Sequence, residues 1–187
     1  MNSKFNLVTH VNKSTANDYQ TPPKAVDLLL GNYLSQTSYK TVWECASGEG
    51  NIVKVLNDNG YNVISTDVKN GHDFTMEIMN RMLIKDNEYD IIVTNPPFNL
   101  KNKFIEICHS LRKPFALLLP LTALESDRRH KVWREGLLLL IPNKRINFSR
   151  PHWTDSNNKN FGGAWFPSAW FVGGPDINDH TIRFCKF

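Results

Sequence analysis

Short apolar runs alternate with amphipathic stretches along most of this chain, and no other feature narrows the possible folds as much. Apolar runs of this length predict strands, and apolar residues at helical spacing predict helices. Because parallel strands are joined by crossover connections, usually helices, this order predicts an α/β fold with a mostly parallel sheet. Strands are expected at Thr41–Ala46, Tyr61–Thr66, Tyr89–Thr94, Phe115–Leu119 and Leu137–Ile141, and helices at Asn51–Asn57, about 101–111 and Ala123–Arg134.

The two ends of the chain depart from this alternation. Residues 1–18 are polar without periodicity and are expected to form a flexible arm, whereas residues 19–187 are expected to form a single domain around one core. Thr21, which precedes two prolines, predicts the N-cap of a first helix. Toward the carboxyl end, Lys144–Phe148 and Trp165–Val172 predict an antiparallel edge hairpin with a polar loop between its strands.

A glycine turn, Glu44 to Gly50, lies between the first predicted strand and the next helix. Open α/β sheets bind nucleotide-like ligands at this place, and Gly48 and Gly50 would let the backbone approach such a ligand closely. Glycine is also the ordinary residue of any strand-to-helix turn, so the turn alone leaves both interpretations open.

Acidic residues around the turn narrow the chemistry of the expected ligand. Asp67 follows the second strand, where a carboxylate can accept hydrogen bonds from both hydroxyls of a ribose. Glu44 and Glu49 would repel a pyrophosphate and favour a cation, so S-adenosylmethionine fits better than NAD. Asp73 and Phe74 offer an acceptor and an apolar wall for an adenine, although an aspartate such as Asp73 more often caps a turn.

The tetrapeptide Asn95–Phe98, with the sequence Asn-Pro-Pro-Phe, directly follows an apolar strand. An amine conjugated to a ring or a carbonyl is a poor nucleophile because its lone pair is delocalised, and acceptors for both of its hydrogens would restore its nucleophilicity. The Asn95 side-chain oxygen and the Pro96 carbonyl can be those acceptors, and the two prolines hold them in place. Phe98 would stack on the target base. The pattern therefore predicts methyl transfer to a conjugated amino nitrogen.

On these motifs the sequence resembles the Rossmann-like, S-adenosylmethionine-dependent amino methyltransferases, particularly the small phage-type DNA adenine-N6 methyltransferases, from Tyr19 to about Val172. The resemblance implies a Rossmann-like methyltransferase fold, S-adenosyl-L-methionine as cofactor, and the N6 amino group of adenine in DNA as the target. It implies a catalytic motif made of Asn95, Pro96, Pro97 and Phe98. It implies a cofactor site made of Tyr19, Gln20, Thr21, Pro22, Glu44, Ala46, Gly48, Gly50, Asp67, Asp73, Phe74 and Asn95.

Basic and aromatic residues are the expected contacts to nucleic acid. Arg128, Arg129 and Lys131 lie on one predicted helix, and Arg145 lies near the predicted hairpin. Trp153, in the polar loop, suits stacking in the gap that an extruded base leaves. The alternative is an ordinary solvated surface, since acidic residues are interspersed with the first group. No added segment for reading bases is evident, so specificity is expected to be low or to come from a protein partner.

Composition excludes several other classes of protein. Three scattered cysteines argue against a disulfide framework, no spacing suggests a metal site, and no leader or long apolar run predicts secretion or a membrane span, so a cytoplasmic protein is expected. Three alternatives stay open beside DNA methylation. They are methylation of adenine N6 in RNA, methylation of a protein glutamine, for which the tetrapeptide commonly ends in tyrosine rather than Phe98, and a catalytically idle protein that binds cofactor or nucleic acid.

Overall fold

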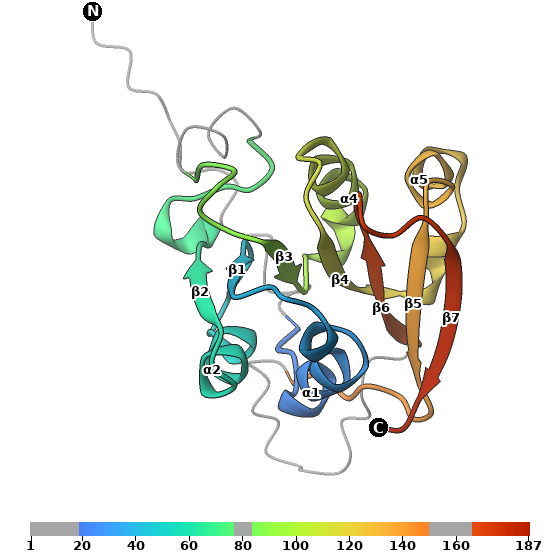
Figure 1. The fold of residues 1–187 in the computed structure, drawn as a ribbon, viewed down its shortest axis with the longest axis horizontal. Helices are drawn as coiled ribbons and strands as arrows, with labels where there is room; N and C mark the ends of the chain where they lie inside the picture. The colour runs from blue at the N-terminus through green and yellow to red at the C-terminus, as the bar shows by residue number, and fades with distance from the viewer. Residues whose placement is uncertain (1–18, 77–83, 150–165) are drawn as a thin grey trace, which may run out of the picture.

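A seven-stranded sheet forms the centre of the molecule, in the spatial order β2-β1-β3-β4-β6-β5-β7 (Figure 1). The computed structural model describes residues 19–76, 84–149 and 166–187. The strands are β1 (Thr41–Glu44), β2 (Asn62–Ser65), β3 (Ile91–Thr94), β4 (Phe115–Pro120), β5 (Leu137–Pro142), β6 (Ser168–Gly173) and β7 (His180–Cys185).

The strand directions create one point at which the order along the chain reverses. Neighbouring strands from β2 to β4 are parallel, as are β5 and β7, while β6 runs antiparallel to both β4 and β5. The chain first places β2 on one side of β1 and then crosses to place β3 on the other side. In open α/β sheets, the crevice outside the carboxyl ends of the strands at such a switch point binds ligands. The glycine turn after Glu44 and the tetrapeptide after Thr94 both begin at this switch point, at the carboxyl ends of β1 and β3.

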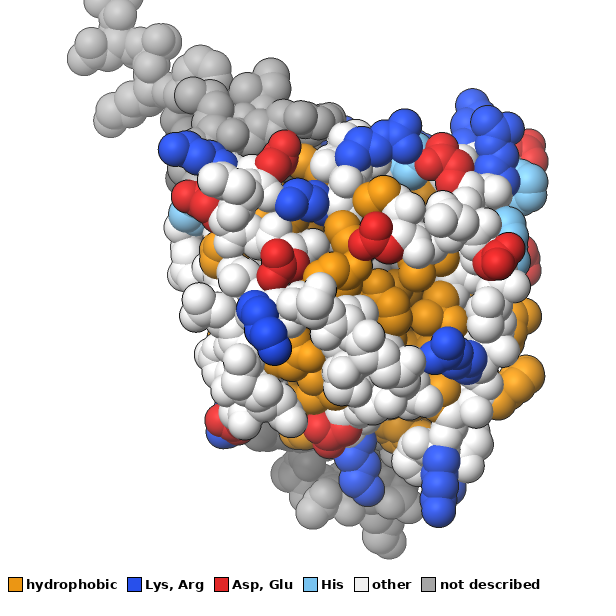
Figure 2. Space-filling view, viewed as in Figure 1, with side chains coloured by type: hydrophobic (Ala, Val, Ile, Leu, Met, Phe, Trp, Pro, Cys, Tyr) orange, Lys and Arg blue, Asp and Glu red, His pale blue; other side chains and the backbone are white. Residues whose placement is uncertain are grey.

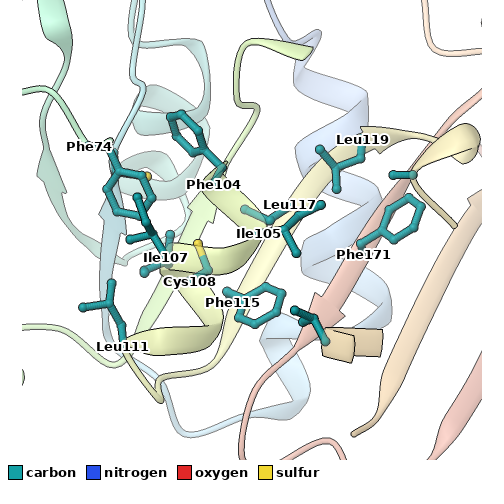
Figure 3. Close-up of a cluster of buried hydrophobic side chains, with 14 of the residues drawn as sticks. Phe74, Phe104, Ile105, Ile107, Cys108, Leu111, Phe115, Leu117, Leu119 and Phe171 are labelled. Carbon is teal, nitrogen blue, oxygen red and sulfur yellow. The ribbon is translucent and has the colours of Figure 1, made fainter. Parts of the chain in front are cut away.

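Helices cover both faces of the sheet, because each face of the central strands is apolar. In β4, Phe115, Leu117 and Leu119 pack in the cluster that contains α4 and α5, while Ala116 and Leu118 pack in the cluster that contains α1 and α2. The first of these clusters is drawn in Figure 3. The helices are α1 (Pro23–Asn32), α2 (Asn51–Asp58), α4 (Lys101–Ser110) and α5 (Asp127–Trp133), with short 3-10 turns η2 (Leu34–Gln36), η3 (Val68–Asn70), η4 (Phe98–Leu100) and η5 (Leu121–Leu124). The predicted Rossmann-like α/β class is confirmed.

The antiparallel part of the sheet is also confirmed, but it is built differently from the predicted edge hairpin. β6 lies between β4 and β5 rather than at the edge, and all 6 of its residues are buried. Its neighbour is β5, with Leu138 opposite Val172, and the segment Lys144–Phe148 forms no strand. The edge is β7, an exposed strand that the sequence analysis did not predict.

Two helix boundaries also differ from the prediction. The expected helix at Ala123–Arg134 is divided into η5 and α5, because Ser126 has a φ of 128° and its hydroxyl caps α5 by accepting a hydrogen bond from the Arg128 N–H at 3.2 Å. The first helix has Pro22 as its N-cap, with no side-chain cap. The Thr21 hydroxyl is therefore not the predicted cap, and it bonds to another side chain described below.

Within the described ranges, no helix has the length and apolarity needed to cross a bilayer. The same residues contain no group of three or more His, Cys, Asp and Glu side chains that would hold a metal ion. The predicted arm at residues 1–18 lies outside the described residues.

Candidate active site

The glycine turn after β1 is fixed against the end of β2. Gly48 and Gly50 have φ angles of 52° and 81°, in the left-handed region that favours glycine. The Ser47 N–H donates to the Thr66 carbonyl at 3.1 Å, and the Gly48 N–H donates to Asp67 Oδ2 at 2.9 Å. The turn is thus a preformed loop that leads into the amino end of α2.

Asp67 is where the sequence analysis expected a ribose-binding carboxylate. The residue is 7% exposed and caps η3, because its Oδ1 accepts the Lys69 N–H at 2.8 Å. Both carboxylate oxygens therefore already hold one backbone N–H each, and each oxygen keeps a further lone pair. The position beside the glycine turn agrees with the predicted role, and the existing bonds give Asp67 a structural role as well.

Glu44 is a buried carboxylate at the carboxyl end of β1. Its side chain is 0% exposed, Oε1 accepts the Ala46 N–H at 3.0 Å, and Oε2 has no hydrogen-bond partner among the described residues. Burial raises the pKa of Glu44 to about 8, and the negative charge of Asp67 acts in the same direction, while the Ala46 N–H that Oε1 accepts opposes it. The N–H of Ala46, a residue of the predicted cofactor site, is committed to Glu44.

Asn95 has the clearest unsatisfied acceptor in the site. Its Nδ2 donates to the Tyr19 carbonyl at 2.9 Å and to the Thr21 hydroxyl oxygen at 3.0 Å. Its Oδ1 is buried and has no hydrogen-bond partner in the part of the chain that the structure describes. The Pro96 carbonyl accepts no backbone hydrogen bond from those residues, whereas the Pro97 carbonyl accepts the Leu100 N–H at 2.8 Å. Asn95 Oδ1 and the Pro96 carbonyl are the two predicted acceptors, and neither has a hydrogen-bond partner among the described residues.

Phe98 lies in a cluster of four aromatic rings and is itself 8% exposed. Its ring stacks on Tyr19, with ring centroids 5.4 Å apart and planes at 26°, and meets Phe166 edge-on at 5.0 Å and Phe148 at 6.2 Å. These rings come from the tetrapeptide, the segment before α1 and both sides of residues 150–165. A planar ligand that stacks on Phe98 would therefore contact this cluster or displace part of it.

The Phe74 ring does not form the predicted wall for an adenine, because it is buried in the core. Phe74 is 3% exposed and packs in the core against Trp43, with ring centroids 5.2 Å apart. Its other aromatic neighbour is Phe104, with ring centroids 4.8 Å apart (Figure 3). Asp73 forms a turn instead, because its Oδ1 accepts the Thr75 N–H at 2.8 Å and the Thr75 hydroxyl at 2.7 Å. An aspartate followed two residues later by threonine is a turn signal, as the competing interpretation of Asp73 held.

The segment Tyr19 to Pro22 reaches the site, but its polar groups are used within the protein. Besides the bonds to Asn95, the Thr21 carbonyl accepts a hydrogen bond from Asn51 Nδ2 at 3.3 Å, and Gln20 forms an isolated antiparallel bridge with Ser149. Asn51 and Thr94, whose buried hydroxyl has no partner among the described residues, were missed by the sequence analysis. Their positions in the sequence could have identified them as site residues, because Asn51 starts the helix after the glycine turn and Thr94 directly precedes the tetrapeptide.

The predicted basic contacts do not form one surface. Arg129 is 9% exposed, and its guanidinium donates to Asn102 Oδ1 at 2.7 Å, the Ala123 carbonyl at 2.9 Å and two further carbonyls, so the prediction that it contacts phosphate is corrected to a structural role. Arg128 is paired with Glu106. Lys131 and Arg145 are exposed, and Trp153 lies outside the described residues. On the face in Figure 2, basic side chains occur at separate places with acidic ones between them.

No protein-family model matches this sequence, and a search of curated proteins gives no match. Among solved structures, the fold is similar to that of the plantazolicin methyltransferase BpumL in complex with SAH, at 12% identity over 81% of this chain and 81% of that chain, with a TM-score of 0.38. A likeness at this level assigns neither a ligand nor an activity to this chain.

Proposed function

We propose that this protein is an S-adenosylmethionine-dependent methyltransferase whose target is the N6 amino group of adenine in nucleic acid, with DNA favoured over RNA. The observation that carries the proposal is a pair of neighbouring acceptors, Asn95 Oδ1 and the Pro96 carbonyl, that no described residue occupies. The amide is held by two hydrogen bonds through its nitrogen, while its oxygen and the Pro96 carbonyl have no partner among the described residues. An exocyclic amino group supplies the two N–H donors that such a pair lacks.

Asn95 and Pro96 would only have to accept two hydrogen bonds from the target amino group. Bound S-adenosylmethionine would supply an electrophilic methyl group on a sulfonium sulfur. Asn95 Oδ1 and the Pro96 carbonyl would accept the two amino hydrogens, which favours the geometry in which the nitrogen lone pair can attack. Because both acceptors are already fixed, little ordering remains at the moment of reaction. The nitrogen loses its extra proton after the transfer, so no strong base is required at the site.

Several groups in the site suit a cofactor of this kind. The two glycines with positive φ give a turn that a ligand can approach closely, and Asp67 has lone pairs left for ribose hydroxyls. Glu44 presents a buried oxygen without a partner in the described residues, which suits a donor on a cationic ligand. Negative charge from Asp67 disfavours a pyrophosphate here.

The aromatic cluster supports a nucleobase rather than an aliphatic amide as the target. Three rings surround Phe98, and flat π-systems stack on such surfaces with a gain of about 1–3 kcal/mol per base. A glutamine side chain offers no comparable surface. The net charge of +4 suits a polyanion, and the preference for DNA rests on the motif resemblance. We further propose that sequence specificity is low or comes from a protein partner.

The deciding experiment measures transfer of labelled methyl from S-adenosylmethionine to single-stranded DNA, duplex DNA, RNA and protein, followed by digestion and identification of the product. We expect N6-methyldeoxyadenosine, formed faster on single strands because a paired base must first leave the stack. The Asn95→Ala protein supplies the background. Label in RNA alone would select the RNA alternative, and label on glutamine would overturn the nucleic-acid target. Cofactor binding without transfer to any polymer would indicate an idle protein.

A further inference from the structure

The segment Tyr19–Thr21 touches the tetrapeptide at both its polar and its aromatic residue. The Tyr19 carbonyl and the Thr21 hydroxyl accept hydrogen bonds from Asn95 Nδ2, and the Tyr19 ring stacks on Phe98. These residues stand before α1, far in sequence from the motif that they contact. We propose that this segment, which we call the strap, sets the orientation of the Asn95 amide, and that Thr21 is a positioning residue for methyl transfer. The inference rests on the proposed function.

The orientation of the amide is decided by its partners. A carbonyl oxygen can only accept, so the group that faces the Tyr19 carbonyl has to be the Asn95 nitrogen. The Thr21 hydroxyl oxygen accepts the second hydrogen of that nitrogen, which satisfies both donors. Oδ1 is then the group left for substrate. Without Thr21, a single hydrogen bond would hold the amide, and it would rotate more freely away from that arrangement.

The strap is itself anchored from two sides. The Gln20 N–H donates to the Ser149 carbonyl at 2.8 Å, and the Ser149 N–H donates back at 3.4 Å. Asn51, the first residue of α2, donates through Nδ2 to the Thr21 carbonyl at 3.3 Å. Thr21 is 4% exposed, so its hydroxyl is shielded from water that would compete for the bond. The strap therefore joins the start of α2, the tetrapeptide and the chain before residue 150.

This placement gives Thr21 a role different from the one that the motif resemblance implies. A residue that lines the cofactor would change cofactor affinity when altered. A residue that orients Asn95 would change the rate of transfer and leave cofactor affinity unchanged. The two roles thus predict opposite results for one substitution.

The test is Thr21→Val, which keeps the side-chain shape and removes the hydroxyl, with Thr21→Ser as the conservative rescue. We expect the single-turnover rate of methyl transfer to fall roughly tenfold or more in Thr21→Val, the dissociation constant for S-adenosylmethionine to stay within about twofold, and Thr21→Ser to recover most of the rate. Thr181→Val, an exposed threonine on β7, is the matched control. An unchanged rate in Thr21→Val, or an affinity loss as large as the rate loss, would overturn the positioning role.

A second readout does not depend on activity. Hydrogen exchange of the Asn95 side-chain amide, followed by NMR on nitrogen-15-labelled protein, should be faster in Thr21→Val by about fivefold, as expected for loss of one hydrogen bond. Equal exchange in both proteins would refute the strap. If the wild-type protein transfers methyl to no polymer, the proposed function fails, and this exchange measurement still decides whether the strap holds Asn95.

Discussion

Two regions of the molecule bury polar side chains, and they do so in opposite ways. At the switch point between β1 and β3, three buried oxygens have no hydrogen-bond partner among the described residues, those of Glu44, Thr94 and Asn95. Under α5, Arg129 is also largely buried, but its guanidinium donates to one side-chain oxygen and three carbonyls. Of these two regions, only the first contains buried side-chain atoms that have no hydrogen-bond partner among the described residues.

The difference separates binding from structure better than residue type does. An unpaired buried polar group costs about 1–3 kcal/mol, so a fold tolerates several together only where something else offsets the cost, such as a ligand. A buried guanidinium with four of its five N–H donors paired has most of that cost offset, and it fixes the local backbone. By this criterion, Asn95 belongs to a site and Arg129 to the scaffold, although the sequence alone suggests that both are functional.

The largest effect is expected at Asn95. Asn95→Ala removes one of the two acceptors, and turnover should fall by about 100-fold or more, in line with the loss of one preorganised group that acts in the transition state. Because the side chain does not hold the glycine turn, the dissociation constant for S-adenosylmethionine should change little. Asn57→Ala, an exposed asparagine on α2, is the matched control. Full turnover by Asn95→Ala would show that its unpaired buried oxygen does not mark a functional site, and the contrast with Arg129 would no longer separate binding from structure.

Arg129 should show the reverse pattern. Arg129→Met would leave Asn102 Oδ1 and several carbonyls without their donor, and the free energy of unfolding should fall by about 2–4 kcal/mol. Denaturant unfolding measures this, with Arg134→Met, an exposed arginine next to α5, as the control. If Arg129→Met unfolds like the wild type but binds nucleic acid more weakly, the structural assignment of Arg129 is wrong.

The effect expected at Glu44 depends on pH. Its pKa is raised to about 8 in the folded protein, against an ordinary value of 4.5. Between these values the unfolded chain carries the ionised carboxylate and the folded chain the protonated one, so stability falls as pH rises from about 4.5 to 8 and is constant above. Glu44→Gln does not titrate, so relative to the wild type it should stabilise the protein by about 4 kcal/mol more at pH 8 than at pH 4.5, at about 1.4 kcal/mol per pKa unit.

Thermal unfolding of both proteins across this pH range tests the prediction. Above about pH 8, where the Glu44 carboxylate is ionised, the same substitution should also weaken binding of a cationic cofactor. A stability difference between the two proteins that is independent of pH would show that Glu44 does not titrate between pH 4.5 and 8, and would contradict the prediction.

The sequence predicted the fold well wherever periodicity was strong. β4 and β5 were predicted within one residue of their bounds, because both are continuous apolar runs. β7 was missed because its exposed edge position imposes little apolar pattern. The place of β6 depends on which strands it pairs with, and local pattern carries no information about that long-range choice.

The site was predicted in part for a similar reason. Asn95, Glu44 and Asp67 come together because the carboxyl ends of adjacent parallel strands meet at one edge, and sequence order reveals that. Which polar atoms are already occupied is a matter of tertiary contacts. The sequence therefore assigned Thr21 to a helix cap and Phe74 to a ligand, whereas one bonds to Asn95 and the other packs in the core.

The smallest effect is expected from the exposed basic residues. With Arg129 buried and Arg128 paired, Lys131 and Arg145 are the remaining described members of the predicted contact set. If both contact phosphates, Lys131→Ala with Arg145→Ala should reduce the slope of log affinity against log salt concentration by roughly 2, since each phosphate contact contributes about 0.9. Lys54→Ala, on α2 and paired with Asp58, should leave the slope unchanged. An equal slope in the wild type, the double variant and Lys54→Ala would show that Lys131 and Arg145 do not contact phosphates. The switch point would then be the one region of the described residues that still supports the proposed function.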